Sequence, residues 1–441
     1  MKAEFLHHLL PMWRAWQDSP DHHSLDKWLS NYWKQGAIVA KKRGKDPLSV
    51  KVRLALGDSM LQAQRYLQLA AALEESFRTQ TILDWAEWDA KWSQAKSKLP
   101  PEDVFWFWVL CLTDVELAKE WRLEKRDERL MWYETLAKHF EESSDLSAAL
   151  IRAGLRPSWA PLLQQRVDES GWTHEQLLTF ISMQTVRPPV WLRTKTNDIE
   201  ALMQSLKKEM LRVDLVDGRL CVQGGAYIAK TDAYTNGLIE IQDYASQQIA
   251  ETIVVKSGDK VWDACAGAGG KSLAIAQQLN NTGGVTATDL HQYKLDELKR
   301  RAKRSELFNI RSFVWDGKNP LALPQDIRKN KGFDWVLIDA PCTSAGTWRR
   351  NPDARWRFNP TDTQELVTLQ RQLLRNASEA VKLGGHLVYA TCSWQVAENE
   401  DQIRWFTTIF TGFELVSQQM LGAPTQNCDT MFVAVLKRVN G

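Results

Sequence analysis

Two cysteines stand in stretches whose residue types could do covalent chemistry. Cys392 ends the strand-like run HLVYATC (386–392), which follows a Gly-Gly turn, and Cys342 lies in DAPCTS (339–344). A thiolate is strongly nucleophilic near neutral pH, and covalent catalysis can divide one difficult step into easier ones. Buried strand cysteines are common and inert, however, so each residue taken alone favours a packing role. Either thiol is a candidate nucleophile.

A glycine-rich turn follows another strand, in VWDACAGAGGKS (261–272). Gly267, Gly269 and Gly270 permit positive φ and close approach of the backbone to a ligand, and the helix that follows presents free N–H groups. The spacing is neither GxxxxGK[ST], because Cys265 stands where the first glycine is required, nor strict GxGxxG. The stretch therefore predicts a ligand loop at the carboxyl end of a strand.

Aspartates close the strands expected next to this loop. Asp263 lies near the end of the first strand, Asp289 ends the second and Asp316 ends the third. Such carboxylates can accept hydrogen bonds from ribose hydroxyls or lie beside an adenine. Acidic strand ends without a pyrophosphate-type loop favour S-adenosylmethionine over NAD. The alternative is that these aspartates only form turns, which Asp favours in any case.

Strand-like and helical segments alternate from about residue 239 onward, which implies a mainly parallel α/β sheet with right-handed crossovers. Helical segments separate the first six strands, whereas the last two are joined by a loop too short for a full helix and are expected to pair antiparallel. A seven-stranded sheet with such a terminal pair resembles the Rossmann-like class I methyltransferases. The expected strands are 261–265, 285–289, 311–316, 334–340, 386–392, 413–418 and 431–438.

A chain of 441 residues is too long for one ordinary core, and we expect three parts. Residues 1–148 show apolar residues at three- and four-residue spacing and predict a Trp-rich helical domain. Residues 149–235 predict a small α+β unit, and residues 236–441 predict the methyltransferase domain. Eleven of the 21 tryptophans precede residue 135, for which a Trp-rich core is favoured over exposed platforms for stacked bases.

The composition excludes several classes of protein. The net charge is only +2, so any basic surface must be local. No apolar run of about 18 residues predicts a transmembrane helix, and the N-terminal MKAEFLHHLLPMW lacks the apolar core of a secretion signal. The six cysteines are scattered without a CxxC pair, so we expect no metal site, no disulfide framework and a cytoplasmic location.

The stretch DAPCTSAGTWRRNPDARW (339–356) carries a family resemblance. Read with DACAGAGGKS, GLIEIQDYASQ (237–247) and YATCS (389–393), it closely resembles the Sun/Fmu-type RNA (cytosine-5) methyltransferases of the NOL/NOP/Sun family. The resemblance covers about residues 150–441, including PPVWLRTKT (188–196). In this family the sheet binds S-adenosylmethionine, and RNA docks across the small α+β domain and the catalytic face. Some members carry a helical domain similar to the NusB fold, which residues 1–148 suit loosely.

The resemblance implies a role for each motif residue. Cys392 would be the nucleophile that adds to carbon 6 of the cytosine, Cys342 would help to release the product, and Asp339 would reach both cofactor and base. Because DNA cytosine methyltransferases use the cysteine of a Pro-Cys motif, Cys342 is the rival nucleophile. Asp289 would hold the ribose, and Asp316 would lie by the adenine. The loop around the methionine part of the cofactor would comprise Cys265, Ala266, Gly267, Ala268, Gly269, Gly270 and Lys271.

Two basic segments are candidates for RNA contact. KLDELKRRAKR (294–304) has six basic residues, and WRRNPDARWR (348–357) interleaves four arginines with two tryptophans, which suits phosphate contact and base stacking. A base in structured RNA must be splayed or flipped to reach Cys392. The predicted RNA-binding residues are Arg349, Arg350, Arg355, Trp356 and Arg193.

The sequence departs from the family pattern in three stretches. Ala268 stands where the family commonly has Pro, Ser344 where Gly is frequent, and residues 429–432 read DTMF instead of D-G-F-F. We nevertheless expect a monomeric S-adenosylmethionine-dependent enzyme that methylates carbon 5 of a cytosine in RNA, with small-subunit rRNA favoured and tRNA the alternative substrate. The alternative from another class is a non-catalytic RNA-binding ribosome assembly factor. The presence of both cysteines and the glycine loop argues against that alternative.

Overall fold

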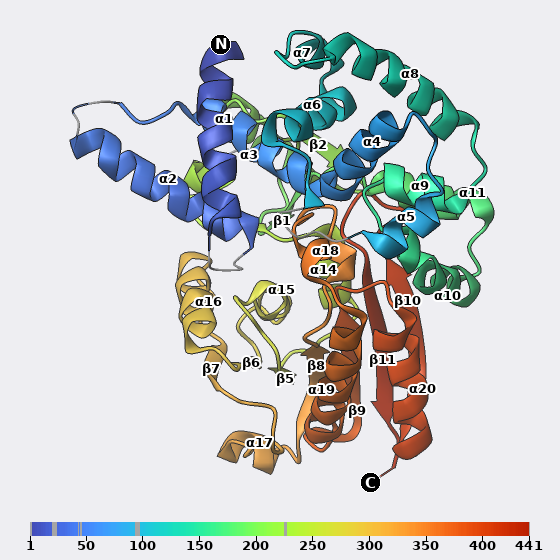
Figure 1. Ribbon diagram of the computed structural model, residues 1–441. Coiled ribbons are helices and arrows are strands. Elements are labelled where there is room, and N and C mark those ends of the chain that lie inside the picture. Colours follow the sequence, from blue (N-terminus) through green and yellow to red (C-terminus); the bar gives the residue numbers. More distant parts are fainter. Residues whose placement is uncertain are drawn as a thin grey trace. The chain divides into compact units, whose positions relative to one another are not determined.

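The computed structural model describes residues 2–19, 24–42, 44, 46–92, 98–224 and 227–440. The chain forms two compact units (Figure 1). One comprises residues 1–187 together with 348–358, and the other comprises residues 188–347 and 359–441. We call them the helical unit and the α/β unit.

The helical unit is built from amphipathic and fully apolar helices around a tryptophan-rich core (Figure 1). Helix α6 reads EDVFWFWVLCLT and is buried from Val104 to Cys111, because it is apolar on every side. Trp85, Trp106 and Trp108 are almost completely buried, so they pack in the core and offer no platform for bases. The helices are α1 (Lys2–Gln17), α2 (Leu25–Lys42), α3 (Val50–Arg65), α4 (Leu67–Thr79), α5 (Trp85–Lys91), α6 (Glu102–Thr113), α7 (Val115–Lys119), α8 (Arg126–Glu142), α9 (Leu146–Arg152), α10 (Ala160–Ser170), α11 (His174–Met183) and α18 (Ala354–Arg357).

The boundaries of the helical unit differ from the predicted boundary after residue 148. Helix α9 contacts α4, α5, α8 and α11, so the segment up to residue 187 completes the helical core. The short segment 348–358 also belongs to this unit, although both of its flanks belong to the α/β unit. Its Trp348 packs against Trp159, with ring centroids 4.7 Å apart and ring planes tilted by 37°. These contacts join residues far apart in the sequence, which local patterns do not reveal.

A four-stranded antiparallel sheet opens the α/β unit, in the order β2-β3-β1-β4. Leu192 and Leu220 of this sheet pack with Leu202 and Leu206 of α12, which gives the small α+β part its own apolar core. The α+β character predicted for this region is thus present, from residue 188 rather than 149. The elements are β1 (Val190–Thr194), α12 (Ile199–Lys208), β2 (Val213–Val216), β3 (Arg219–Val222), α13 (Asp232–Thr235) and β4 (Ile239–Ile241).

The seven-stranded sheet has the order β10-β11-β9-β8-β5-β6-β7. The strands from β9 through β8, β5 and β6 to β7 pair in parallel, whereas β11 pairs antiparallel with both β9 and β10. All seven predicted strands and the antiparallel terminal pair are therefore confirmed. The elements are α14 (Tyr244–Glu251), β5 (Lys260–Asp263), α15 (Gly270–Gln278), β6 (Gly284–Asp289), α16 (Gln292–Arg304), β7 (Ile310–Val314), α17 (Gln325–Lys329), β8 (Phe333–Asp339), α19 (Pro360–Ser378), β9 (Val381–Thr391), α20 (Glu400–Ile409), β10 (Phe413–Leu421) and β11 (Met431–Arg438).

Helices cover both faces of this sheet, as in a doubly wound fold. Alternate residues of β8 enter opposite cores: Leu337 packs with α14 and α15, whereas Val336 packs with α19 and α20. Burial on both faces explains why β8 reads as a continuous apolar run. The arrangement brings the carboxyl ends of β5, β6, β8 and β9 to one edge, where the predicted chemistry lies.

Candidate active site

The predicted ligand loop connects β5 to α15 and folds as the glycines require. Gly269 is the N-cap of α15 with φ of +87°, and a Cβ there would lie 2.6 Å from the Leu298 side chain. Gly267 has φ of +56°, and its amide donates to Asp289 Oδ2 at 3.0 Å. Asp289 thus orients the loop backbone from the end of β6. Gly269 is needed both for its backbone conformation and for the close approach of Leu298, whereas Gly267 is needed for its backbone conformation alone.

Asp263, at the end of β5, is an ionisable group in an almost fully buried position. Its Oδ2 accepts a hydrogen bond from Ser272 Oγ at 2.6 Å, while the buried Oδ1 accepts none from the residues that the structure describes. Burial raises the pKa of Asp263 to about 7. A buried carboxylate oxygen without a donor is costly unless a ligand supplies one. The sequence identified Asp263 as an acid at a strand end, but it did not indicate that one of its carboxylate oxygens would be buried without a hydrogen-bond donor.

Lys271 and Asp339 form a buried ion pair across the site. Lys271 Nζ lies 2.6 Å from Asp339 Oδ2, and the two side chains are 8% and 33% exposed. Although burial lowers the pKa of Lys271, the Asp339 carboxylate raises it above its ordinary value. The pair joins the start of α15 to the end of β8, so a predicted cofactor residue and a predicted catalytic residue are in contact.

The two candidate cysteines lie side by side, with Cys342 Sγ 3.2 Å from Cys392 Sγ. Both are free and partly buried. The adjacent parallel strands β8 and β9 bring them together, because Asp339 pairs with Ala390 and the Ala340 amide donates to the Ala390 carbonyl.

The hydrogen bond between the two thiols shifts their pKa values in opposite directions. The hydrogen bond with Cys342 lowers the pKa of Cys392 below its usual value, against the effect of burial. The same hydrogen bond, together with burial, raises the pKa of Cys342 well above its usual value. The pair therefore favours a Cys392 thiolate that accepts a hydrogen bond from a Cys342 thiol.

Glu398 holds the loop that carries Cys342, a role that the sequence did not reveal. This fully buried carboxylate accepts hydrogen bonds from the Thr343 amide at 2.9 Å and the Thr343 hydroxyl at 2.6 Å. A third donor is Gln370 Nε2 at 3.1 Å. Gly346 closes the loop, since its amide donates to the Cys392 carbonyl and a Cβ there would lie 1.7 Å from the Thr430 carbonyl oxygen.

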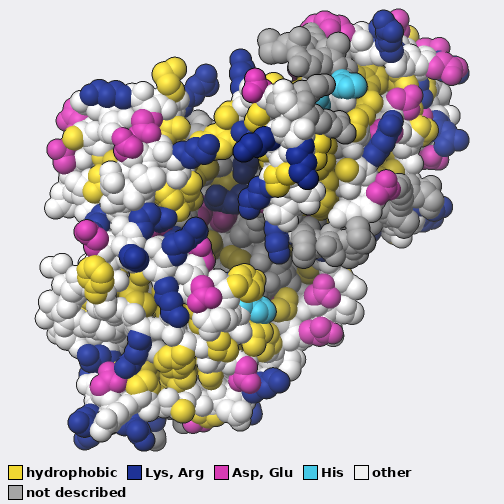
Figure 2. Space-filling view, turned by 90° about the vertical axis from the view of Figure 1, so that its left-hand side faces the viewer, with side chains coloured by type: hydrophobic (Ala, Val, Ile, Leu, Met, Phe, Trp, Pro, Cys, Tyr) yellow, Lys and Arg dark blue, Asp and Glu magenta, His cyan; other side chains and the backbone are white. Residues whose placement is uncertain are grey.

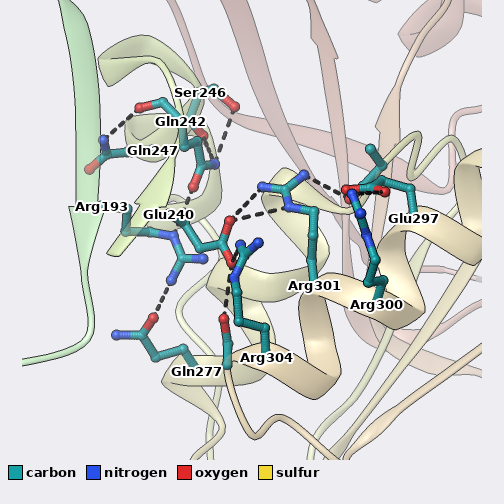
Figure 3. A network of polar contacts seen from close by, with 12 residues as sticks. Arg193, Glu240, Gln242, Ser246, Gln247, Gln277, Glu297, Arg300, Arg301 and Arg304 are labelled. Atoms are coloured by element: carbon teal, nitrogen blue, oxygen red, sulfur yellow. Dashed lines mark hydrogen bonds and ion pairs between the residues drawn. The ribbon is translucent and has the colours of Figure 1, made fainter. Parts of the chain in front are cut away.

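A cluster of buried ion pairs on α16 and β4 contacts the ligand loop (Figure 3). Arg301 and Arg304 of α16 converge on Glu240 of β4, with Arg301 Nη2 at 2.9 Å from Glu240 Oε2. Arg301 Nη1 also donates to the Ala268 carbonyl at 2.8 Å. Although burial raises the pKa of Glu240, the two arginines lower it below its usual value. Two of the six basic residues of segment 294–304 therefore serve the protein interior.

The structure contradicts most of the predicted RNA contacts. Arg349 and Arg355 are 1% and 0% exposed, and Trp356 is 8% exposed, so these side chains are buried in the helical unit. Their polar groups donate to backbone carbonyls: Arg349 to Met183, Arg355 to Gly154 and Trp356 to Gln64. A segment that alternates Arg and Trp can bind RNA, but it can also fill a helical core and donate hydrogen bonds to backbone carbonyls there. In this protein segment 348–358 does the latter.

Arg193 and Arg350 complete the predicted set. Arg193 donates to Gln242 Oε1 at 2.8 Å and to Gln277 Oε1, and burial lowers its pKa to about 10 (Figure 3). Arg193 therefore holds β1 against neighbouring elements, while Arg350 is half-buried. Other Lys and Arg side chains do lie on the surface, and Figure 2 shows a face of the protein where many of them gather.

Asp316 lies beyond the end of β7 and is exposed, and its Oδ1 accepts the Lys318 amide at 3.0 Å. Its predicted place beside an adenine stays a prediction. Among the described residues, no group of three or more His, Cys, Asp or Glu side chains is arranged to hold a metal ion. In the same part of the chain, no helix has the length and apolar character needed to cross a membrane.

Known methyltransferases are similar to this chain in sequence. The family model described as 16S rRNA methyltransferase RsmB/F matches residues 250–437. The Bacillus subtilis (strain 168) protein named "Probable ribosomal RNA small subunit methyltransferase B" is 31% identical over 278 residues, which cover 62% of this chain and 61% of the relative. "Ribosomal RNA small subunit methyltransferase B" of Klebsiella pneumoniae (strain 342) is 30% identical over 308 residues, which cover 65% of this chain and 67% of the relative. The chain thus spans about three fifths to two thirds of the length of these two relatives.

Solved structures share the fold. The structure named PH0851 superposes with a TM-score of 0.66 at 24% identity, covering 90% of this chain and 93% of that one. NSun6 from Pyrococcus horikoshii, solved with SFG, superposes with a TM-score of 0.53 at 19% identity, covering 64% of this chain and 98% of that one. At these identities the likeness concerns the fold alone, and it agrees with the seven-stranded sheet described above.

Proposed function

Because this chain belongs to the RsmB/F family of 16S rRNA methyltransferases, we propose that it methylates carbon 5 of a cytosine in small-subunit rRNA, with S-adenosylmethionine as methyl donor and a covalent bond between Cys392 and the base. The observation that carries this proposal is the pair of thiols 3.2 Å apart at the ends of β8 and β9. A site with one thiolate and one thiol in contact suits a reaction that must both form and break a bond between sulfur and carbon.

The residues of the ligand loop fit S-adenosylmethionine. The buried Asp263 Oδ1, which accepts no hydrogen bond from the described residues, suits the cofactor's ammonium group. The amides at the N-terminus of α15 suit its carboxylate, and Asp289 suits its ribose. Bound there, the cofactor supplies an electrophilic methyl group on a sulfonium.

In this proposal Cys392 begins the reaction, as the resemblance implies, and the lowered pKa of its thiol is consistent with that role. Its thiolate adds to carbon 6, the ring double bond shifts, and carbon 5 becomes nucleophilic enough to accept the methyl group. The Lys271–Asp339 pair holds a proton that can be shared with nitrogen 3, which makes carbon 6 more electrophilic. Carbon 5 then loses its proton to a base, the carbon–sulfur bond breaks, and Cys392 leaves as a thiolate. Cys342 serves this last step: as a thiol it positions the base and donates a hydrogen bond to the departing Cys392 sulfur, and it can itself be the base only after it has given up its own proton.

Two cysteine variants test the order of events. We expect Cys392→Ala to abolish both methylation and the covalent RNA adduct, whereas Cys342→Ala accumulates an adduct that survives denaturing electrophoresis. Cys221→Ala removes a buried cysteine of the four-stranded sheet and serves as the matched control. We expect this variant to methylate RNA and to form the covalent intermediate as the wild type does. The reverse pattern for Cys392 and Cys342 would contradict the assignment of the nucleophile.

The substrate is tested in cells. We expect bisulfite sequencing of total RNA from a strain lacking this protein to show one or more 5-methylcytosines lost from small-subunit rRNA, restored by the intact chain and not by Cys392→Ala. A mark lost from tRNA instead would contradict the choice of substrate. An unchanged methylation pattern would contradict the enzymatic proposal and favour an RNA-binding assembly factor.

A further inference from the structure

Ser344 has a backbone conformation that a residue with a side chain seldom adopts. Its φ is +55°, in the left-handed region that favours glycine. Ser344 lies in the loop after β8, two residues beyond Cys342, and is half-buried. A non-glycine residue held in this region at a reactive site is a reason to look for a role of its side chain.

The Ser344 side chain faces the other cysteine. Its Oγ lies 3.5 Å from Cys392 Sγ and accepts a hydrogen bond from the Cys392 thiol. When Cys392 is ionised it has no proton to donate, and at the same distance the hydroxyl can rotate to donate to the thiolate. The backbone around it is well anchored, because the Ser344 carbonyl accepts the Thr347 amide at 2.9 Å and the Gly346 amide donates to the Cys392 carbonyl at 2.9 Å. The left-handed turn at Ser344 therefore points a hydroxyl at the sulfur of a neighbouring strand.

We propose that Ser344 is a positioning residue that donates a hydrogen bond from its hydroxyl to the Cys392 thiolate and so increases the fraction of Cys392 that is nucleophilic. The proposal deepens the proposed function, on which its catalytic meaning rests. A thiolate accepts hydrogen bonds more strongly than a thiol, so a second donor beside Cys342 favours the charged form.

The other charged and titratable groups around Cys392 divide in their effects. Cys342 of the same loop and Lys271 of α15 lower the pKa of Cys392, whereas burial and Asp339 of β8 raise it. Glu398 acts one step away, by raising the pKa of Cys342. Removal of the Ser344 hydroxyl leaves all of these groups in place, so its contribution can be measured separately.

The experiment measures alkylation of Cys392 by iodoacetamide between about pH 6 and 10, in reducing buffer without RNA or cofactor, with peptide mass spectrometry to separate Cys392 from Cys342. Wild type is compared with Ser344→Ala and Ser344→Gly. Both variants remove the hydroxyl, but only glycine relieves the left-handed backbone. We expect both to raise the apparent pKa of Cys392 by about one unit, from the size of a hydrogen bond to a charged group.

Three outcomes are decisive. Equal upward shifts in both variants, with Ser344→Gly at least as thermally stable as wild type, support the proposal. An unchanged pH profile in both variants overturns it, and so does a shift in only one of them, because that result assigns the effect to the backbone or to the Cβ. Alkylation requires neither RNA nor methyl donor, so a failure of the proposed methylation would appear separately, as wild-type protein without transferase activity.

Discussion

Replacement of Asp263 by an asparagine tests the physical character of the cofactor site. Asp263 is 1% exposed, and its burial raises its pKa from 3.8 to about 7. Between these two values the folded protein binds a proton that the unfolded chain releases. Stability contributed by this group is therefore present at low pH and is lost as the pH rises toward and through 7.

The magnitude follows from the two pKa values. The full difference corresponds to about 4 kcal/mol, of which about 2–3 kcal/mol falls between pH 5 and pH 8. The amide that replaces the carboxyl group does not titrate, so we expect Asp263→Asn to lack this part of the pH dependence. Any constant cost of an amide in place of the carboxylate cancels when each protein is compared with itself at the two pH values.

The assay is urea unfolding of the full chain at pH 5 and pH 8, followed by tryptophan fluorescence, for wild type and Asp263→Asn. Every other titrating group is common to both proteins, so the difference between their pH dependences isolates Asp263. Saturating S-adenosylmethionine should reduce the wild-type loss at pH 8, because its ammonium group would stabilise the ionised carboxylate. Identical pH dependences in wild type and variant without cofactor would refute the argument from burial.

Four further substitutions test the parts that hold the site and the helical unit. Gly269→Ala places a Cβ 2.6 Å from a leucine side chain, so we expect it to lower the free energy of unfolding by about 1–3 kcal/mol. The Cβ of Gly267→Ala meets no atom within 4 Å, so this variant should lose only about 1 kcal/mol through backbone strain. Urea unfolding measures both losses. Arg301→Gln removes the charged donor to the Ala268 carbonyl, a hydrogen bond of about 1.5–3 kcal/mol. Calorimetry should therefore show the affinity for S-adenosylmethionine falling about tenfold or more, and an unchanged affinity would contradict the role of Arg301 in holding the ligand loop. Arg355→Met leaves buried carbonyls without their donor and should destabilise the helical unit by about 2–4 kcal/mol in urea, and an unaltered unfolding curve would rule this out.

The order of elements in the α/β unit was predictable because it depends on local patterns. Buried parallel strands appear as short apolar runs, and the glycines between β5 and α15 mark a turn that only glycine adopts easily. Asp289 and Lys271 were predicted for the same reason, since a strand end and a helix start are places in the sequence. The contacts that they make, to the Gly267 amide and to Asp339, belong to the tertiary structure.

Segment 348–358 shows where local patterns mislead. Its arginines and tryptophans are the residue types that bind RNA, and they are equally the types that fill a core whose backbone carbonyls need donors. Arg355 reaches the Gly154 carbonyl about two hundred positions away in the sequence, and no local pattern contains such a contact. The surface role predicted for these residues was therefore wrong, although the residue types were read correctly.

The sequence by itself determined which groups are available for chemistry: two cysteines, a glycine loop and acids at strand ends. The tertiary structure decided which of them meet and in which direction each shifts the pKa of its neighbour. Cys342 and Cys392 are fifty residues apart in the chain and 3.2 Å apart in space, because β8 and β9 pair in parallel and end together. Only at that distance does one thiol stabilise the thiolate of the other, since hydrogen bonding and charge act through space and not along the chain.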